Sequence, residues 1–312
     1  MKSIRRSAPL RLVTGLFCLV ALGIGAVVLC LKPVDLPRVV RIGSVADLQN
    51  SYAVLDYGLP QVRQSGAVPH VVLTAVPHDW DKGLDTDERK RVFFETVLPL
   101  VLIANRAVMK DRRRLLGIVA VRNRGAVLAQ AEGHWLAQLA WRYRVDPPEA
   151  GDPDSTDRVI AALRPRVAPV PPSLALAQSA VESAYGTSRF ATGGNALFGQ
   201  WTSGSGMTPE QQRASKTGWT VARFTAPLSS VEAYLRNLNT HNAYREFRRS
   251  RASLMQRGGI ASGPALATTL SAYSEKGAVY TQTLREIIRT NDLASLDRAF
   301  LEPQPRIRLI VP

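Results

Sequence analysis

The chain contains 312 residues, of which 46% are hydrophobic, and its formal charge is +15. This length allows two domains, or one domain with a large extension. A strongly basic chain favours an anionic partner such as a nucleic acid, a membrane surface or an acidic wall polymer. The sequence has no nucleic-acid-binding motif, and its Lys and Arg residues are spread along the chain. We therefore expect no nucleic-acid partner.

The N-terminal 31 residues have the pattern of a membrane anchor. Residues 12–31 contain no charge, and twenty such residues suffice for a helix to cross the hydrocarbon core. The first eleven residues contain four basic side chains and no acid. This asymmetry predicts a cytoplasmic segment at 1–11 and a single-pass signal-anchor helix at 12–31 in the cytoplasmic (inner) membrane. The rest of the chain is then expected on the periplasmic or extracytoplasmic side.

A cleaved signal peptide is the alternative to this anchor. Signal peptides usually have an apolar stretch of roughly 7–15 residues, followed by small residues at the cleavage site. Here the run is longer and ends in Leu29, Cys30 and Leu31. Cys18 and Cys30 are the only cysteines of the sequence, and both lie in this run. No disulfide framework is therefore expected in the rest of the chain.

Between the anchor and the middle of the chain we expect a spacer at 32–84 and a helical region at 85–165. The spacer is rich in Pro and Gly, and its short β-branched runs predict a few strands. Asp85 and Glu88 have the spacing of a capping box. Apolar residues follow at helical intervals on both sides of Pro99, which should kink that helix. A second helix is expected at 126–144, and a polar turn at 151–157 is a candidate boundary.

Residues 170–186 predict a buried helix that contains a single charged residue. Two prolines open it, and Gly186, which tolerates a left-handed backbone, closes it. Small and apolar residues occupy almost every side, so Glu182 in the last turn stands out. Burial and the helix dipole should both raise the pKa of its carboxyl, as a general acid requires. Glu182 could equally pair with Arg189 or cap a backbone group. Gln178 could orient the Glu182 carboxyl for catalysis, or it could simply provide that carboxyl with a hydrogen-bond partner.

Five blocks of sequence carry a resemblance. They are FFETVLPL at 93–100, LALAQSAVESAYGTSRF at 174–190, GNALFGQW at 194–201, SVEAYLRNLNTHNAY at 230–244 and LSAYSEKGAVY at 270–280. In this order they resemble the bacterial N-acetylglucosaminidase family of flagellar hydrolases and autolysins, and within it the Bax-like proteins. The resemblance implies a mainly α, lysozyme-like glucosaminidase domain at 166–298, with a small β-lobe over a groove that holds a glycan strand. It also implies peptidoglycan as the substrate.

The resemblance implies roles for several residues. Glu182 matches the catalytic acid of the family, and Tyr273 matches a tyrosine that faces the groove. Tyr280 matches the second tyrosine of the same motif. It shares a helical stripe with Leu284, however, so packing in the core is the alternative to contact with the substrate.

The block after the predicted helix implies three further substrate-binding candidates beside Gln178. Asn195 and Phe198 match an asparagine–phenylalanine motif. Asn195 could bond a sugar acetamido or hydroxyl group, or it could be a turn residue with a left-handed backbone. Trp201 could offer an apolar face to a sugar ring or belong to the core.

A second catalytic carboxylate is expected in the β-lobe, because most glycosidases use two carboxyl groups. Glu210 is the only acid in the corresponding stretch, 202–224, and it could instead sit in a capped turn. Without it, the 2-acetamido group of the substrate can assist, with Tyr273 orienting that group. Residues 219–224 alternate like a strand of the lobe.

The predicted activity is that of an endo-β-N-acetylglucosaminidase acting on peptidoglycan. The alternatives are a lytic transglycosylase and a non-catalytic wall-binding scaffold. The four histidines are not spaced as metal ligands, and no Gly-rich phosphate loop precedes a helix, so we expect neither a metal nor a cofactor. His241 is expected to form hydrogen bonds at a helix end. Residues 299–312 form a C-terminal tail whose alternation near the end suits an edge strand or a loose tail.

Overall fold

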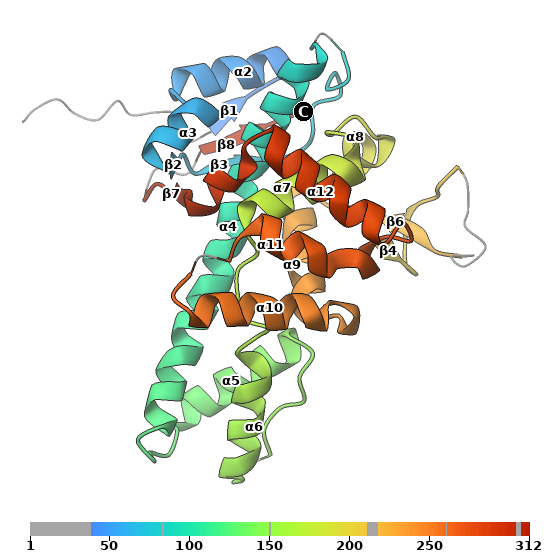
Figure 1. Ribbon diagram of the computed structural model, residues 1–312. Helices are drawn as coiled ribbons and strands as arrows, with labels where there is room; N and C mark the ends of the chain where they lie inside the picture. Colours follow the sequence, from blue (N-terminus) through green and yellow to red (C-terminus); the bar gives the residue numbers. More distant parts are fainter. Residues whose placement is uncertain (1–38, 83, 150, 211–217, 260, 304–306) are drawn as a thin grey trace, which may run out of the picture. The chain divides into compact units, whose positions relative to one another are not determined.

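The computed structural model describes residues 39–312 except 83, 150, 211–217, 260 and 304–306. The predicted cytoplasmic segment at 1–11 and the predicted anchor at 12–31 lie outside the described residues. Within the described part, helices dominate, and the strands form three small sheets (Figure 1).

The longest helix, α4 (Thr86–Arg122), begins where the sequence predicts. The Asp85 side chain accepts hydrogen bonds from the backbone N–H groups of Asp87 and Glu88, and the helix continues through Pro99. Among the described helices, α4 alone is long and apolar enough to cross a membrane, but 72% of its apolar window is buried inside the protein. Length and composition are weak evidence for a membrane span when the helix is covered in this way.

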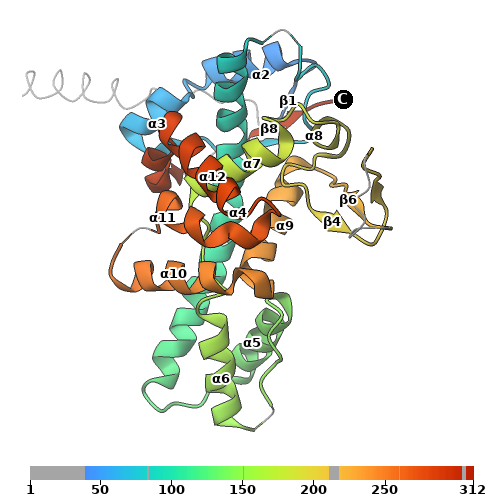
Figure 2. The same cartoon turned by 45° about the vertical axis from the view of Figure 1, so that its right-hand side comes forward.

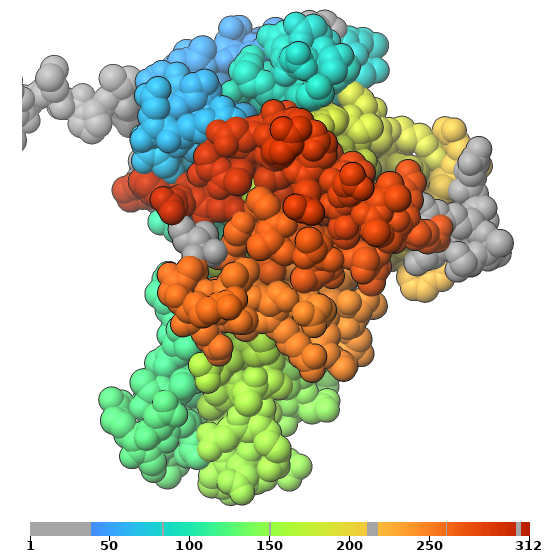
Figure 3. All heavy atoms as spheres, viewed as in Figure 1, coloured from blue at the N-terminus to red at the C-terminus, as the bar shows by residue number. Residues whose placement is uncertain are grey.

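Helix α7 (Pro172–Ser183) lies at the centre of the helices that follow α4. It contacts α4, α11 (Gly263–Ala267) and α12 (Ala278–Thr290), as Figure 2 shows. Nearly all of its side chains are buried, as its small and apolar sequence predicts. Helices α9 (Pro227–Thr240) and α10 (Arg245–Gln256) complete this part of the fold. In the space-filling view of Figure 3, the C-terminal helices, in orange and red, form much of the surface of this face.

The C-terminal residues form a central strand, not the expected edge strand or loose tail. Strand β8 (Ile307–Ile310) pairs in parallel with β1 (Val39–Arg41) on one side and with β3 (Val71–Leu73) on the other. Strand β7 (Phe300–Leu301) pairs in parallel with β2 (Ala67–Val68). The alternation at the end of the sequence predicted a strand, but pairing on both of its sides depends on segments more than 200 residues away.

The region predicted as a spacer is folded onto the same compact unit, which extends from residue 38 to 312. Its strands were expected, but helices α2 (Val45–Val54) and α3 (Leu59–Ser65) were not. Ser44 and Asp47 form a capping box at the start of α2. Gly58 precedes α3, and Gly66 ends it in the left-handed conformation. Both helices thus have typical boundary residues, although the stretch that contains them is rich in Pro and Gly.

A second hydrophobic cluster lies between the C-terminal half of α4 and two shorter helices, α5 (Gln130–Arg142) and α6 (Pro153–Leu163), seen at the bottom of Figure 1. The turn predicted at 151–157 is wrong beyond its first residues. Asp152 caps the N-terminus of α6 and Pro153 is its first residue. Proline at this position is typical of a helix start.

The β-lobe lies between α8 (Arg189–Gly194) and α9. Strands β4 (Trp201–Thr202), β6 (Thr220–Ala222) and β5 (Gly206–Met207) form an antiparallel sheet in the order β4-β6-β5. A lobe strand within 219–224 was predicted, and β6 confirms it. Short 3-10 helices, η2 (Asn242–Tyr244), η3 (Thr268–Tyr273) and η4 (Leu293–Arg298), connect the later helices.

Candidate active site

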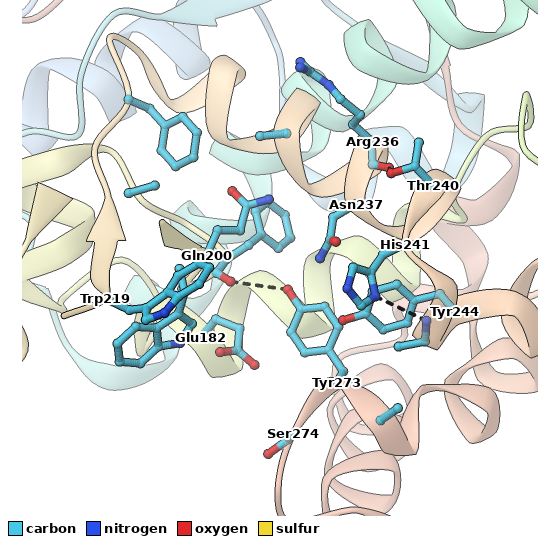
Figure 4. Close-up of a pocket in the computed structure, with 18 of the residues that line it drawn as sticks. Glu182, Gln200, Trp219, Arg236, Asn237, Thr240, His241, Tyr244, Tyr273 and Ser274 are labelled. Carbon is cyan, nitrogen blue, oxygen red and sulfur yellow. Dashed lines mark hydrogen bonds between the residues drawn. The ribbon is translucent and has the colours of Figure 1, made fainter. Parts of the chain in front are cut away.

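A cavity of about 780 Å³ contains Glu182 in its wall (Figure 4). We call it the Glu182 cavity. The end of α7, the β-lobe, α9 and the segments around η2 and η3 contribute its lining. Glu182 is half-buried, so the predicted acid lies at the boundary between the core and an open space large enough for a ligand.

The backbone turns sharply directly after Glu182. Helix α7 ends at Ser183, and Ala184, Tyr185 and Gly186 all have positive φ angles of 50°, 54° and 82°. The helix therefore ends three residues before the glycine that was predicted to close it. The Trp80 indole N–H donates to the Tyr185 carbonyl at 2.7 Å. A Cβ at Gly186 would lie 2.6 Å from the same indole nitrogen, so glycine is required there by close packing as well as by φ.

A chain of hydrogen bonds reaches Glu182 from the core. The Tyr234 hydroxyl donates to Gln178 Oε1 at 2.6 Å, and Gln178 Nε2 donates to the Tyr280 oxygen at 3.0 Å. The Tyr280 hydroxyl then donates to Glu182 Oε1 at 3.0 Å. Gln178 is fully buried and Tyr280 is 3% exposed. Gln178 thus acts on the carboxylate through Tyr280, and Tyr280 has a core position and a polar role at the same time.

Two aromatic stacks hold this hydrogen-bond chain in place. The Tyr273 and Tyr280 rings are parallel to within 2°, with centroids 5.7 Å apart, and the Tyr273 hydroxyl donates to the Phe198 carbonyl at 3.3 Å. The buried Phe198 ring stacks on Tyr234 at 3.9 Å. Burial first, and the charge of Glu182 second, raise the pKa values of Tyr273 and Tyr280. Both hydroxyls therefore remain protonated and able to donate.

The structure gives Asn195 a place in a turn. Its φ of 54° is left-handed, and it ends α8. Its Oδ1 accepts from Val76 N and its Nδ2 donates to the Phe224 carbonyl, both at 3.1 Å. With both ends of the amide bonded to backbone and no place among the residues that line the Glu182 cavity, the geometry favours the turn role over sugar binding.

Trp201 lines the Glu182 cavity together with Trp219. Trp201 is paired with Val221 across the sheet. Trp219 precedes Val221 by two residues and so belongs to the same face of the lobe as Trp201. Trp219 is 41% exposed, and Figure 4 shows it beside Glu182. The sequence analysis used Trp219 only as part of a strand pattern, so this second indole was missed.

Glu210 does not line the Glu182 cavity. Its side chain is 86% exposed, and its carboxylate lies 3.5 Å from Arg189 Nε. Among the described residues that line the cavity, Glu182 is the only acid, and the undescribed stretch 211–217 contains none in its sequence. Within the described chain, no group of His, Cys, Asp and Glu side chains has the arrangement of a metal site.

One face of α9 was missed as part of the site. Arg236, Asn237 and Thr240 line the Glu182 cavity, and His241 and Tyr244 continue the same wall (Figure 4). The signal was available, because residues three and four positions apart share a helix face, as Asn237 and Arg236 do with Thr240. His241 has the predicted helix-end role, since its Nδ1 accepts from Ala243 N at 3.2 Å. The lining of the cavity thus contains two arginines, Arg144 and Arg236, and a single acid.

The part of the chain that carries Glu182 is similar to known proteins. Residues 164–293 match the family model Glucosaminidase, described as mannosyl-glycoprotein endo-beta-N-acetylglucosaminidase. Protein bax of Escherichia coli (strain K12) is 31% identical over 215 residues, which cover 65% of this chain and 70% of that protein. No solved structure matches the chain. These matches show that the chain belongs to the Bax-like glucosaminidase family, whose domain is of the glycoside-hydrolase type.

Proposed function

We propose that this chain is an endo-β-N-acetylglucosaminidase that cleaves the glycan strand of peptidoglycan, with Glu182 as its general acid. The observation that carries the proposal is the Tyr280 hydrogen bond to Glu182 Oε1 at the wall of the Glu182 cavity. This bond fixes the orientation of the carboxyl group at the cavity wall, and a general acid needs such a fixed orientation to protonate a glycosidic oxygen. The glucosaminidase match supports the same chemistry.

The single acid of the cavity favours assistance by the substrate. In that route the acetamido oxygen of N-acetylglucosamine forms a bond to its own anomeric carbon. The bond to the leaving oxygen breaks as Glu182 donates its proton to that oxygen. Glu182, now a carboxylate, then removes a proton from the water that opens the cyclic intermediate. Tyr273 is the residue that we propose to orient the acetamide, because it is a protonated donor in the same wall.

The cavity wall also suits a sugar chain. Trp201 and Trp219 offer two indole rings on one side of the β-lobe, and the apolar faces of sugar rings pack well on such groups. Arg144 and Arg236 provide positive charge for the carboxylates of peptidoglycan. We propose Phe198 as a packing residue below Tyr234, and Glu210 as a charge outside the reaction.

We further propose a lysozyme-like arrangement for the domain and an extracytoplasmic site for the reaction. The β-lobe beside a helix that bears the acid supports the first proposal. The uncharged run at 12–31 and the basic residues before it support a single-pass anchor in the inner membrane, with the domain on the periplasmic side.

A digest of purified peptidoglycan tests the activity. The full chain, purified in detergent, would be incubated with the wall material beside its Glu182→Gln variant, and the products identified by mass spectrometry. Products that end in reducing N-acetylglucosamine, present only with the unmodified chain, are expected. Anhydro-muramyl ends would make the protein a lytic transglycosylase. Equal absence of products from both proteins would favour a wall-binding scaffold.

A further inference from the structure

A second cavity of about 350 Å³ lies along a neighbouring face of α9. We call it the Asn239 cavity. Helix α9 contributes Leu235 and Asn239 to it, α4 contributes Ala107 and Asp111, and the end of α5 contributes Arg142. Of the residues that line it, only Arg236 has been given a role in the Glu182 cavity.

The two cavities share a wall. Arg236 lines both of them, and Figure 4 shows its side chain extending away from Glu182. On α9, Asn239 lines the second cavity and the next residue, Thr240, lines the first. After α5, Tyr143 lines the second and Arg144 lines the first. The two cavities are therefore neighbours along α9, with the Arg236 side chain common to both walls.

The charges of the Asn239 cavity differ from those of the Glu182 cavity. It has two acids, Asp111 and Glu232, and two arginines, Arg142 and Arg236. Arg142 Nη1 and Asp111 Oδ2 lie 2.9 Å apart, and the Arg142 side chain is 53% exposed. Glu232 and Arg236 are also exposed. A wall with both positive and negative side chains complements a ligand that carries both carboxylates and an amine. A neutral sugar would form an ion pair with neither kind of side chain.

Two neutral groups of this cavity add hydrogen-bonding capacity. Asn239 is 1% exposed, and its Nδ2 donates to the Ala168 carbonyl at 3.1 Å. Its Oδ1 is buried and has no hydrogen-bond partner among the described residues, which is an unfavourable state for a buried amide. Burial raises the pKa of Tyr143 to about 12, so its hydroxyl remains a donor. Peptide N–H and C=O groups are the natural partners of such a pair.

We propose that the Asn239 cavity binds the stem peptide of peptidoglycan, a short peptide with free carboxylates and a free amine. This proposal rests on the proposed function, because the glycan strand in the Glu182 cavity delivers the peptide. Four residues of an extended peptide span about 13 Å. A stem peptide is therefore long enough to extend past the single side chains that separate the two cavities. The protein then cleaves strands that carry peptides in preference to strands from which an amidase has removed them.

The decisive variant fills the cavity without disturbing the core. Ala107 is exposed on α4 and lines the cavity, so Ala107→Trp should occupy it and still fold. Ala120 is also exposed on α4 and lines neither cavity, which makes Ala120→Trp the matched control. Arg142→Gln tests the charge contribution with little change in size.

Two measurements with the full chain in detergent test the proposal. The first uses calorimetry to measure binding of the free stem tetrapeptide to the Glu182→Gln protein. In that background Arg142→Gln should weaken the affinity about tenfold, as loss of one or two charge-assisted bonds implies. Ala107→Trp should weaken it at least as much, because the indole occupies the cavity, and Ala120→Trp should leave it unchanged. Unchanged affinity in Ala107→Trp, or no peptide binding at all, would overturn the proposal.

The second measurement is the rate of cleavage of peptide-bearing strands relative to amidase-treated strands. Ala107→Trp should remove the preference for peptide-bearing strands and leave the rate on bare strands unchanged. A preference that survives in Ala107→Trp contradicts the proposal. If neither substrate is cleaved while the peptide still binds, the proposed glycosidase function fails and the peptide site stands.

Discussion

The Tyr280 hydroxyl donates to Glu182 Oε1 at 3.0 Å and accepts from Gln178 Nε2 at the same distance. Tyr280 therefore links the buried Gln178 amide to the Glu182 carboxylate at the cavity wall, so that the position of the amide constrains that of the carboxylate. Gln178 is itself held by Tyr234 at 2.6 Å. Because three buried groups fix one another, the orientation of the carboxylate depends on the packing of α7, α9 and α12 together.

Tyr280→Phe should lower kcat about tenfold or more and leave KM nearly unchanged, because it removes the bond that orients Glu182 without altering the cavity wall. It also leaves Gln178 Nε2 without an acceptor, at a cost of about 1–3 kcal/mol in the free energy of unfolding. Steady-state kinetics and urea unfolding check both effects. Tyr273→Phe is the matched control for the second, because its hydroxyl contacts only the Phe198 carbonyl among the described hydrogen bonds. Equal loss of stability in the two variants would contradict the chain of bonds.

The sequence predicted the elements that rest on local patterns. The helical segments at 85–165 and 170–186 and the strand near 220 follow from apolar spacing and capping residues, which act within a few positions. Glu182 could be singled out because a charged residue interrupted an apolar helix. The links from Tyr234 to Gln178 and on to Tyr280 join residues 56 and 102 positions apart. Local spacing contains no signal for such pairs.

The errors of the sequence analysis have the same cause. The central position of β8 depends on partners near the start of the described chain. Trp219 became part of the site only because β4 and β6 pair in the register that puts Val221 opposite Trp201. Asn195 was ambiguous in sequence because asparagine serves both left-handed turns and ligand contacts. Its two backbone partners, Val76 and Phe224, are distant in the chain.

The predicted anchor can be tested by charge insertion. Ala21→Arg places a charge near the middle of residues 12–31, at a cost of about 2.5–3.5 kcal/mol for membrane insertion. The full chain should sediment with membranes and require detergent for release, and Ala21→Arg should reduce that fraction. Ser3→Arg, in the predicted cytoplasmic segment, should behave like the unmodified chain. Protease accessibility of the domain only from the outer side would support the proposed sidedness, and accessibility only from the cytoplasm would contradict it.

Asp297 caps the helix that bears Glu182. Its carboxylate accepts from Ser173 N and Oγ and from Gly263 N, each at 2.9 Å, and Pro171 at the N-cap has no side-chain bond of its own. Asp297→Ala should therefore lower the free energy of unfolding by about 1–3 kcal/mol. Chemical unfolding measures this change, with Asp146→Ala at an exposed position outside the helices and strands as the control.

The pH dependence of this cap has a defined sign. Burial raises the pKa of Asp297 above its usual 3.8, although its hydrogen bonds act in the opposite direction. At pH values between 3.8 and the raised pKa, the folded state binds more protons than the unfolded state. The contribution of this group to stability is then largest below pH 3.8 and decreases as the pH rises through the folded-state pKa. The stability difference between the unmodified chain and Asp297→Asn should fall over this window; a difference that rises would contradict the raised pKa.

Arg251 is fully buried and is surrounded by carbonyl groups. Its Nη1 donates to the Ala168 and Pro169 carbonyls at 3.1 and 3.0 Å, and its Nη2 donates to the Pro165 carbonyl at 2.8 Å. Burial, followed by the nearby Arg112 and Arg248 charges, lowers the pKa of Arg251 to about 9. A lysine ammonium lacks the planar fork that serves three carbonyls at once.

Arg251→Lys should thus lower the free energy of unfolding by about 3 kcal/mol, because buried carbonyls lose their donors. Arg249→Lys, at an exposed position of the same helix, should change it by less than about 0.5 kcal/mol. Guanidinium unfolding of both variants provides the comparison. If the two lysine variants were equally stable, the three carbonyl contacts would contribute nothing.

Gly199 lies near Oε2 of Glu182, whereas Tyr280 donates to Oε1. Its φ is +55°, and a Cβ built there would lie 3.1 Å from Glu182 Oε2. Gly199→Ala therefore combines a strained backbone with a displaced carboxylate. Gly218, in the β-lobe, has a φ of +81° and nothing within 4 Å of its Cβ position, so Gly218→Ala carries the backbone strain alone.

Both alanine variants should lose about 1–2 kcal/mol of stability, the cost of a left-handed conformation in a residue with a side chain. Only Gly199→Ala should lower kcat substantially, by about tenfold or more, because a shift of the acid by a few tenths of an ångström alters its alignment with the leaving oxygen. Thermal unfolding and hydrolysis of peptidoglycan by the two variants separate these effects. Equal kcat losses would mean that backbone strain, and not the contact with Glu182, accounts for the glycine at position 199.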